Sequence, residues 1–182
     1  MAEEKKKKRR GRREHLKDFY QDVTGKYVYG GTMYTCGLPK EEYKRLLNIL
    51  WLCGGGTMAA QILAGCIPAA GMQEGFWVLP FYLGAIISCG MVCWALGELT
   101  SGGDPLREYI YAASVEKLPR RCEFSMVFSG LCLVGLLVKL LWSGLQNSSL
   151  WATVLFVAIQ VAAIGAMLTI KKMLNNLHWC KK

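Results

Sequence analysis

Four long apolar blocks dominate the pattern of hydrophobic and polar positions along the chain. The blocks cover residues 46–70, 76–99, 126–145 and 150–170. A helix rises about 1.5 Å per residue, so about 20 apolar residues are enough to cross the hydrocarbon core of a bilayer. None of the blocks alternates polar and apolar residues as a strand of a membrane barrel would. The pattern therefore predicts an all-α membrane protein built as a bundle of four transmembrane helices.

Two of the three connections between these blocks are very short. Residues 71–75 join the first two blocks, and residues 146–149 join the last two. Links of this length keep consecutive helices antiparallel and adjacent. We therefore expect two antiparallel hairpins packed side by side.

The positive charge of the chain is distributed on one side of this pattern. The net charge is +9, and residues 1–46 hold 13 of the 22 Lys and Arg. The connection 100–124 holds four more, the tail 171–182 another four, and the two short connections none. Because basic connections stay in the cytoplasm, the sequence predicts a multi-pass protein of the cell membrane with both termini cytoplasmic.

The amino-terminal segment, residues 1–45, begins with a dense run of basic side chains. Beside a membrane span, such a run is typical of contact with the anionic inner leaflet. Nucleic acid is the rival partner, but no base-reading motif or stacking platform accompanies the run, so we expect none. The residues predicted to contact the leaflet are Lys5, Lys6, Lys7, Lys8, Arg9, Arg10, Arg12 and Arg13.

Residues 26–34 of the same segment read KYVYGGTMY. Aromatic and β-branched residues flank Gly30 and Gly31, a two-residue turn signal, so the sequence predicts a short cytoplasmic β-hairpin. Further along, Pro39 is suited to open a helix that runs directly into the first span.

The inner connection, residues 100–124, carries a second helix signal. Asp104 is a good N-cap and Pro105 a good first helical residue, and apolar residues recur behind them near helical spacing. We expect an amphipathic helix of about 12 residues that lies on the inner leaflet or docks a partner.

Small residues within the spans predict where helices approach closely. Gly54, Gly55 and Gly56 form a flat patch in the first span, and Gly84 with Ser88 forms a small-xxx-small pair in the second. A different interpretation of the triplet is that it unwinds the first span to line a binding cavity.

Three polar residues lie inside the spans: Gln61, Lys139 and Gln160. An ionisable residue in a span points to a functional site, although Lys139 is only roughly 9 Å from the outer end of its block, within reach of snorkelling. If all three face inward, they form a polar intramembrane cluster suited to an anionic or hydrogen-bonding solute. Alternatively, the glutamines serve as interhelical hydrogen-bond partners.

Residue types that carry chemistry are sparse elsewhere. The eight cysteines fall in apolar blocks or in segments assigned to the reducing cytoplasm, so we expect free thiols. Residues 63–66 resemble a bacterial lipobox over four positions, but they lie too far into the chain for a secretory signal. No phosphate-binding, zinc-protease or hydrolase motif is present, so we expect no catalytic residues, no metal and no cofactor.

Two functional interpretations stay open. The first is a non-enzymatic accessory or scaffold subunit of a membrane complex, with a protein partner or a second copy of itself. It rests on a cytoplasmic mass larger than the outer one and on small-residue helix faces. The second is an oligomeric small-solute carrier or channel protomer built around Lys139, Gln61 and Gln160, because four spans rarely enclose a pathway alone.

Overall fold

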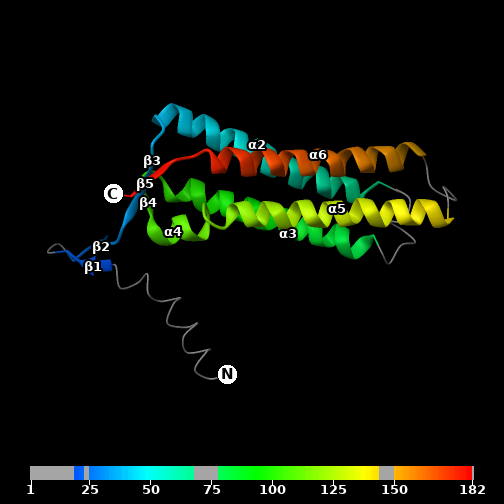
Figure 1. The fold of residues 1–182 in the computed structure, drawn as a ribbon. Coiled ribbons are helices and arrows are strands. Elements are labelled where there is room, and N and C mark those ends of the chain that lie inside the picture. Colours follow the sequence, from blue (N-terminus) through cyan, green and yellow to red (C-terminus); the bar gives the residue numbers. More distant parts are fainter. Residues whose placement is uncertain (1–18, 23–24, 68–77, 144–149, 182) are drawn as a thin grey trace, which may run out of the picture.

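A computed structural model describes residues 19–22, 25–67, 78–143 and 150–181 of the chain. Four long helices make up most of it: α2 (Lys40–Gly65), α3 (Leu79–Gly102), α5 (Leu118–Ser143) and α6 (Leu150–Asn175) (Figure 1). By length and composition, all four can cross a bilayer. The prediction of a mostly helical, multi-pass membrane protein is confirmed at this level.

The four helices form an up-and-down bundle in which α2 and α5 lie at opposite corners. Helix α3 packs against α2 and α5, and α6 packs against the same two helices from the other side. Successive helices run in opposite directions (Figure 1). The two predicted hairpins are therefore present, and the long connection between α3 and α5 joins them into one bundle.

A seven-residue repeat of buried positions explains why the helices pack in this way. Buried residues alternate at spacings of three and four, which keeps one stripe of each helix facing its neighbours in a left-handed bundle. On α6 the stripe comprises Thr153, Phe156, Gln160, Ala163, Met167, Ile170 and Leu174. On α5 it comprises Leu118, Cys122, Ser125, Ser129, Cys132 and Leu136.

Helix α2 is continuous from Lys40, directly after Pro39, through the glycine triplet to Gly65. Pro39 therefore precedes the helix that becomes the first span, as expected. The interpretation in which Gly54–Gly56 unwinds the span is wrong for this structure, because the backbone there is helical.

A small antiparallel sheet lies at one end of the bundle. Its strands are β3 (Met33–Cys36), β4 (Leu106–Arg107) and β5 (Trp179–Lys181), in the order β4-β3-β5. Tyr34 pairs with Leu106 on one side, and Thr35 pairs with Cys180 on the other. The sheet thus joins the amino-terminal segment, the α3–α5 connection and the carboxy-terminal segment at the same end. We call this end, with α4 and the helix ends beneath it, the inner head, after the cytoplasmic side that the sequence predicts for these segments.

The predicted hairpin across Gly30 and Gly31 is wrong. Strand β2 (Tyr27–Tyr29) pairs instead with the earlier strand β1 (Phe19–Gln21), while β3, within the described strands, pairs with β4 and β5. A lone two-stranded hairpin is marginal in water. Strand β3 gains two partners in the head, so these distant pairings replace the local one, and the glycines serve as a link between two sheets.

The predicted helix of the inner connection is also wrong in its start and length. Leu106 and Arg107 form strand β4, and helix α4 (Glu108–Ala113) begins only afterwards, with Arg107 at its N-cap. Pairing with β3 holds these two residues extended, and Leu106 is completely buried. Asp104 therefore does not cap a helix, and α4 packs against α3 and β3 within the head.

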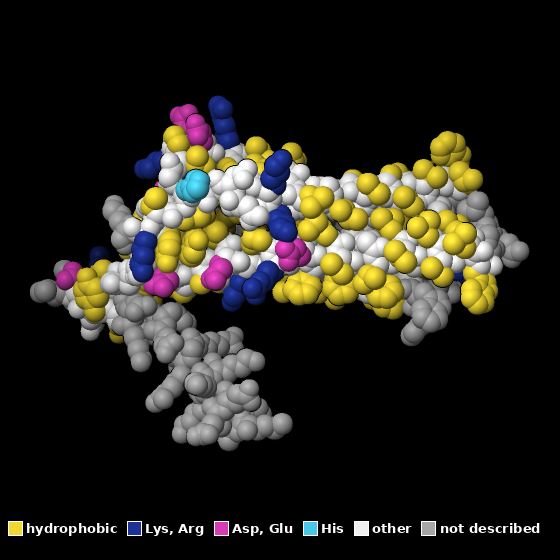
Figure 2. All heavy atoms as spheres, in the orientation of Figure 1, with side chains coloured by type: hydrophobic (Ala, Val, Ile, Leu, Met, Phe, Trp, Pro, Cys, Tyr) yellow, Lys and Arg dark blue, Asp and Glu magenta, His cyan; other side chains and the backbone are white. Residues whose placement is uncertain are grey.

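The surface separates the two regions of the molecule. Apolar side chains cover the helices away from the sheet, and Lys, Arg, Asp and Glu gather towards the inner head (Figure 2). Trp142 and Trp151, at the far end, are 89% and 80% exposed. Burying such large side chains against lipid removes the cost that they would have in water.

Candidate functional site

The centre of the bundle contains a direct hydrogen-bonded pair of glutamines. Gln61 of α2 and Gln160 of α6 are 1% and 0% exposed. The Nε2 of Gln61 donates to Oε1 of Gln160 over 3.0 Å, and the Nε2 of Gln160 donates back over 2.9 Å. The two amides satisfy each other, so the pair ties α2 to α6, as the interhelical interpretation predicts.

Tyr82 joins a third helix to this pair. Its hydroxyl donates to the main-chain carbonyl of Gln61, and its ring lies 5.9 Å from the ring of Phe156. Gly65 makes room for it, because a Cβ at that position would lie 2.7 Å from the Tyr82 hydroxyl. The sequence analysis did not identify Tyr82. Its hydroxyl inside an apolar span could have indicated it, because a buried hydroxyl needs a hydrogen-bond partner.

Lys139 lies on the same inward stripe of α5, nearer the outer end of the bundle. It follows Cys132 by seven residues and Ser125 by fourteen, and both of these are buried. Its side chain is partly exposed. The structure thus brings two of the three predicted polar residues, Gln61 and Gln160, into direct contact.

The predicted packing residues divide into two groups. A Cβ at Gly54 would lie 2.8 Å from Cδ1 of Leu96, and one at Gly84 would lie 2.6 Å from Cδ1 of Phe128, so both glycines allow α3 to approach its neighbours. Gly56 faces open space, and Gly55 meets only Trp51 of its own helix.

Ser88, although buried, does not bridge helices. Its hydroxyl donates to the carbonyl oxygens of Gly84 and Ala85, at 2.8 and 3.0 Å, on its own helix. A serine that bonds back in this way satisfies itself inside the bundle. Its contribution to packing is therefore its small size.

An aromatic cluster fastens the inner head. Tyr34 of β3 stacks on Tyr111 of α4 with ring centroids 4.2 Å apart. The ring of Trp179 meets Tyr111 edge-on at 5.6 Å, and Tyr43 of α2 meets Trp179 at 6.4 Å. Four elements from three regions that are distant in sequence therefore share one cluster, which no local pattern in any of them indicates.

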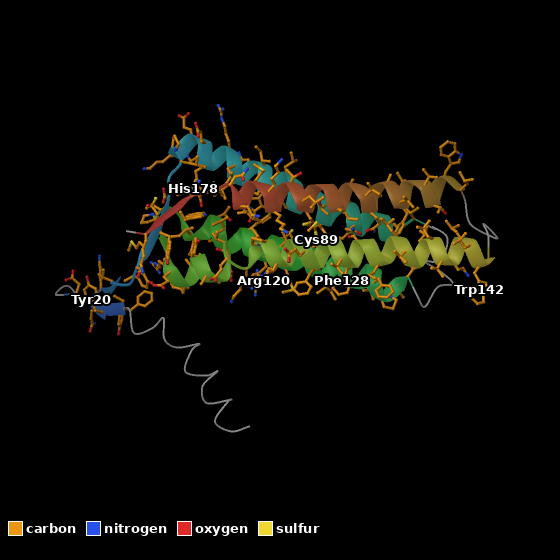
Figure 3. The ribbon with its side chains drawn as sticks, viewed as in Figure 1. Tyr20, Cys89, Arg120, Phe128, Trp142 and His178 are labelled. Atoms are coloured by element: carbon orange, nitrogen blue, oxygen red, sulfur yellow. The ribbon has the colours of Figure 1, made fainter. Side chains whose placement is uncertain are left out.

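Arg107 fastens the β1–β2 hairpin to this head. Its guanidinium lies 5.6 Å from the ring centroid of Phe19 and 5.7 Å from that of Tyr29. The hairpin extends beyond the end of the bundle, with Tyr20 near its far end (Figures 1 and 3). Tyr20 and Tyr27 are 56% and 75% exposed, so the hairpin presents aromatic surface away from the helices.

The thiols of the head differ from one another. Cys36 is buried, and burial raises the pKa of its thiol above the ordinary value. Cys180 is exposed, and both stand as free thiols. Among residues 19–22, 25–67, 78–143 and 150–181, no three His, Cys, Asp or Glu side chains group as metal ligands would. The predicted leaflet-contacting run, Lys5 to Arg13, lies outside the described residues.

The geometry places the molecule in a class: a multi-pass membrane protein whose four membrane-compatible helices carry a folded polar head. No protein-family model, curated protein or solved structure matches the chain.

Proposed function

We propose that this chain is a non-enzymatic accessory or scaffold subunit of a membrane complex, and that its inner head holds a protein partner. The observation that carries the proposal is the β1–β2 hairpin. It is a folded, fastened element, yet it exposes Tyr20 and Tyr27 to solvent.

The chemistry of the hairpin suits docking of another polypeptide. Among the described residues, each of its two strands is paired along one edge, so main-chain donors and acceptors remain along the other edge. A partner strand can add to such an edge, and exposed tyrosines supply large contact areas at a small cost in side-chain entropy. Arg107 limits the movement of the hairpin, which reduces the ordering cost of binding.

The packing of the bundle interior favours a scaffold role over a solute pathway through a single copy of the chain. The glutamine amides are joined to each other, and Tyr82, Leu136 and Phe156 are buried around the outer half of the bundle. A solute would have to break this packing to pass.

The orientation belongs to the same proposal. Apart from Lys139, the basic residues in the described part of the chain fall on the side of the inner head, which the positive-inside rule places in the cytoplasm. The partner would then be a cytoplasmic protein or the cytoplasmic part of another membrane protein.

Site-specific photocrosslinking in native membranes tests the proposal. A photoreactive side chain at Tyr27 should give one discrete adduct, and the same group at Leu141, which is 87% exposed at the opposite end, should not give that adduct. Tyr20→Ser with Tyr27→Ser should abolish co-purification of the same polypeptide. A chain that keeps its fold but gives no adduct at Tyr27 contradicts the proposal.

A second candidate, the oligomeric carrier or channel protomer, is favoured by one observation: Lys139 occupies the inward stripe of α5. We infer that in this case Lys139→Leu abolishes ion or solute flux in proteoliposomes while insertion is unchanged. Equal flux through the wild-type chain and the variant would remove this candidate.

A further inference from the structure

Three basic side chains gather where the apolar surface of the bundle meets the inner head. Arg120 and Arg121 lie in the first turn of α5, and Lys117 directly precedes the helix. Figure 2 shows Lys and Arg side chains at this border, and Figure 3 places Arg120 there.

Arg121 and Lys117 lie on the side of α5 that faces α3, and Arg120 lies next to them on the exposed face of the helix. Phe128 on the side facing α3 packs against Gly84 of that helix. About two turns earlier on α5, Nη1 of Arg121 donates to the main-chain carbonyl of Met91 over 3.1 Å. Lys117 precedes Arg121 by four residues, so it lies on the same flank. The result is a basic patch over the α3–α5 seam rather than a ring of charge around the bundle.

The positive charge of the patch is not neutralised by ion pairs. On α5 itself, Glu123 is bonded to Lys171 of α6 over 2.7 Å, and its negative charge also interacts with Arg120, three residues earlier. Among the described residues, Lys117 and Arg120 form no ion pair, and Arg121 bonds to a neutral carbonyl.

Two carboxylates lie at the margin of this patch. Glu98 accepts a hydrogen bond from Nε1 of Trp94 over 2.9 Å, and its second oxygen is buried; Glu116 is exposed beside Lys117. Neither makes an ion pair with the three cations, so net positive charge remains.

The patch is bordered by apolar, exposed side chains. Trp94 and Phe124 are 70% and 61% exposed next to the three cations. A ligand that satisfies both surfaces must carry an anionic group at the border and hydrocarbon below it. Tryptophan at such a border is typical of the headgroup level of a bilayer.

We propose that this patch binds the headgroup of an anionic phospholipid. The guanidinium groups of Arg120 and Arg121 present paired N–H donors that match a phosphate, Lys117 adds a point charge, and the acyl chains lie along Phe124 and Phe128. This site goes beyond the scaffold proposal, since it involves neither the hairpin nor its partner.

Native mass spectrometry of the full chain, released from nanodiscs of mixed phosphatidylglycerol and phosphatidylcholine, tests the site. Arg120→Gln with Arg121→Gln should lower phosphatidylglycerol retention about 30-fold. The matched control is Lys44→Gln with Arg45→Gln, which removes two exposed charges from the inner end of α2 and should change retention little. Equal losses in the two variants overturn the site.

Further arms separate the patch from its rivals. Arg120→Gln alone changes an exposed side chain, so the fold should persist while retention falls about fivefold. Glutamine at all eight basic positions from Lys5 to Arg13 should leave the retained lipid in place; its loss there assigns the lipid to the amino-terminal run instead. Displacement of the lipid by inorganic phosphate overturns a lipid site in favour of a free-anion site.

Discussion

The bundle and the inner head differ in how the sequence specifies them. In the bundle, each helix carries its own length and its own seven-residue stripe, so neighbours need only align their stripes. In the head, strands of two to four residues become a sheet only when three distant segments meet. The comparison shows that a membrane span can be specified locally, whereas the head is specified by contacts across the whole chain.

The largest expected effect lies in the head, at its most deeply buried strand residue. Leu106→Ala removes a completely buried side chain and should destabilise the head by about 2–5 kcal/mol. The rate of Cys36 alkylation, followed by peptide mass spectrometry, reports opening of the head. Leu141→Ala at the exposed outer end is the control, and equal alkylation rates in the two variants would show that Leu106 is not a core residue of the head.

The next effect tests close packing in the bundle. Gly84→Leu forces Phe128 away and should cost about 1–3 kcal/mol, measured by thermal unfolding in detergent. Gly56→Leu adds the same side chain into open space and should be nearly neutral. Similar losses at both positions would mean that the α3–α5 seam is looser than described.

The glutamine pair should show a smaller, non-additive effect. Gln61→Leu leaves the buried amide of Gln160 without its partner and should cost about 1–2 kcal/mol. Gln61→Leu with Gln160→Leu should recover most of this loss, because no amide is then left unsatisfied. Strict additivity in this double-mutant cycle would argue that the pair does not exist in the membrane.

The smallest effect concerns the pH dependence of the head. Burial raises the pKa of Cys36 in the folded head above its ordinary value of 9.0. The stabilisation by the neutral thiol is therefore fully present below pH 9.0 and is lost as the pH rises through the folded value. Cys36→Ser should reduce this loss of stability at high pH. If the dependence of stability on pH is unchanged in the variant, Cys36 does not cause the loss.

Alkylation supplies the matched comparison. Cys180 is exposed on β5 and should react faster than the buried Cys36 at the same pH. If both thiols react alike in the folded chain, Cys36 is not enclosed by the head.

Several features of the site followed from single residues of the sequence. The apolar blocks indicated four spans, Pro39 marked the start of α2, and Gln61 with Gln160 were identified as candidate interhelical partners. Each depends on chemistry that acts at one place: a length of hydrocarbon to cross, a fixed φ angle, and a buried amide that needs a partner.

The tertiary structure alone decided which secondary structure the polar segments form and which strands pair. Gly30 with Gly31 predicts a turn, and Asp104 predicts a helix cap. In the structure, Leu106 and Arg107 pair with β3 as strand β4, and β2 pairs with β1 instead of β3. The sequence by itself determined the bundle, because the thickness of a bilayer selects helices one at a time. The head depended on tertiary structure, because short strands gain stability only from partners that lie more than seventy residues away in the chain.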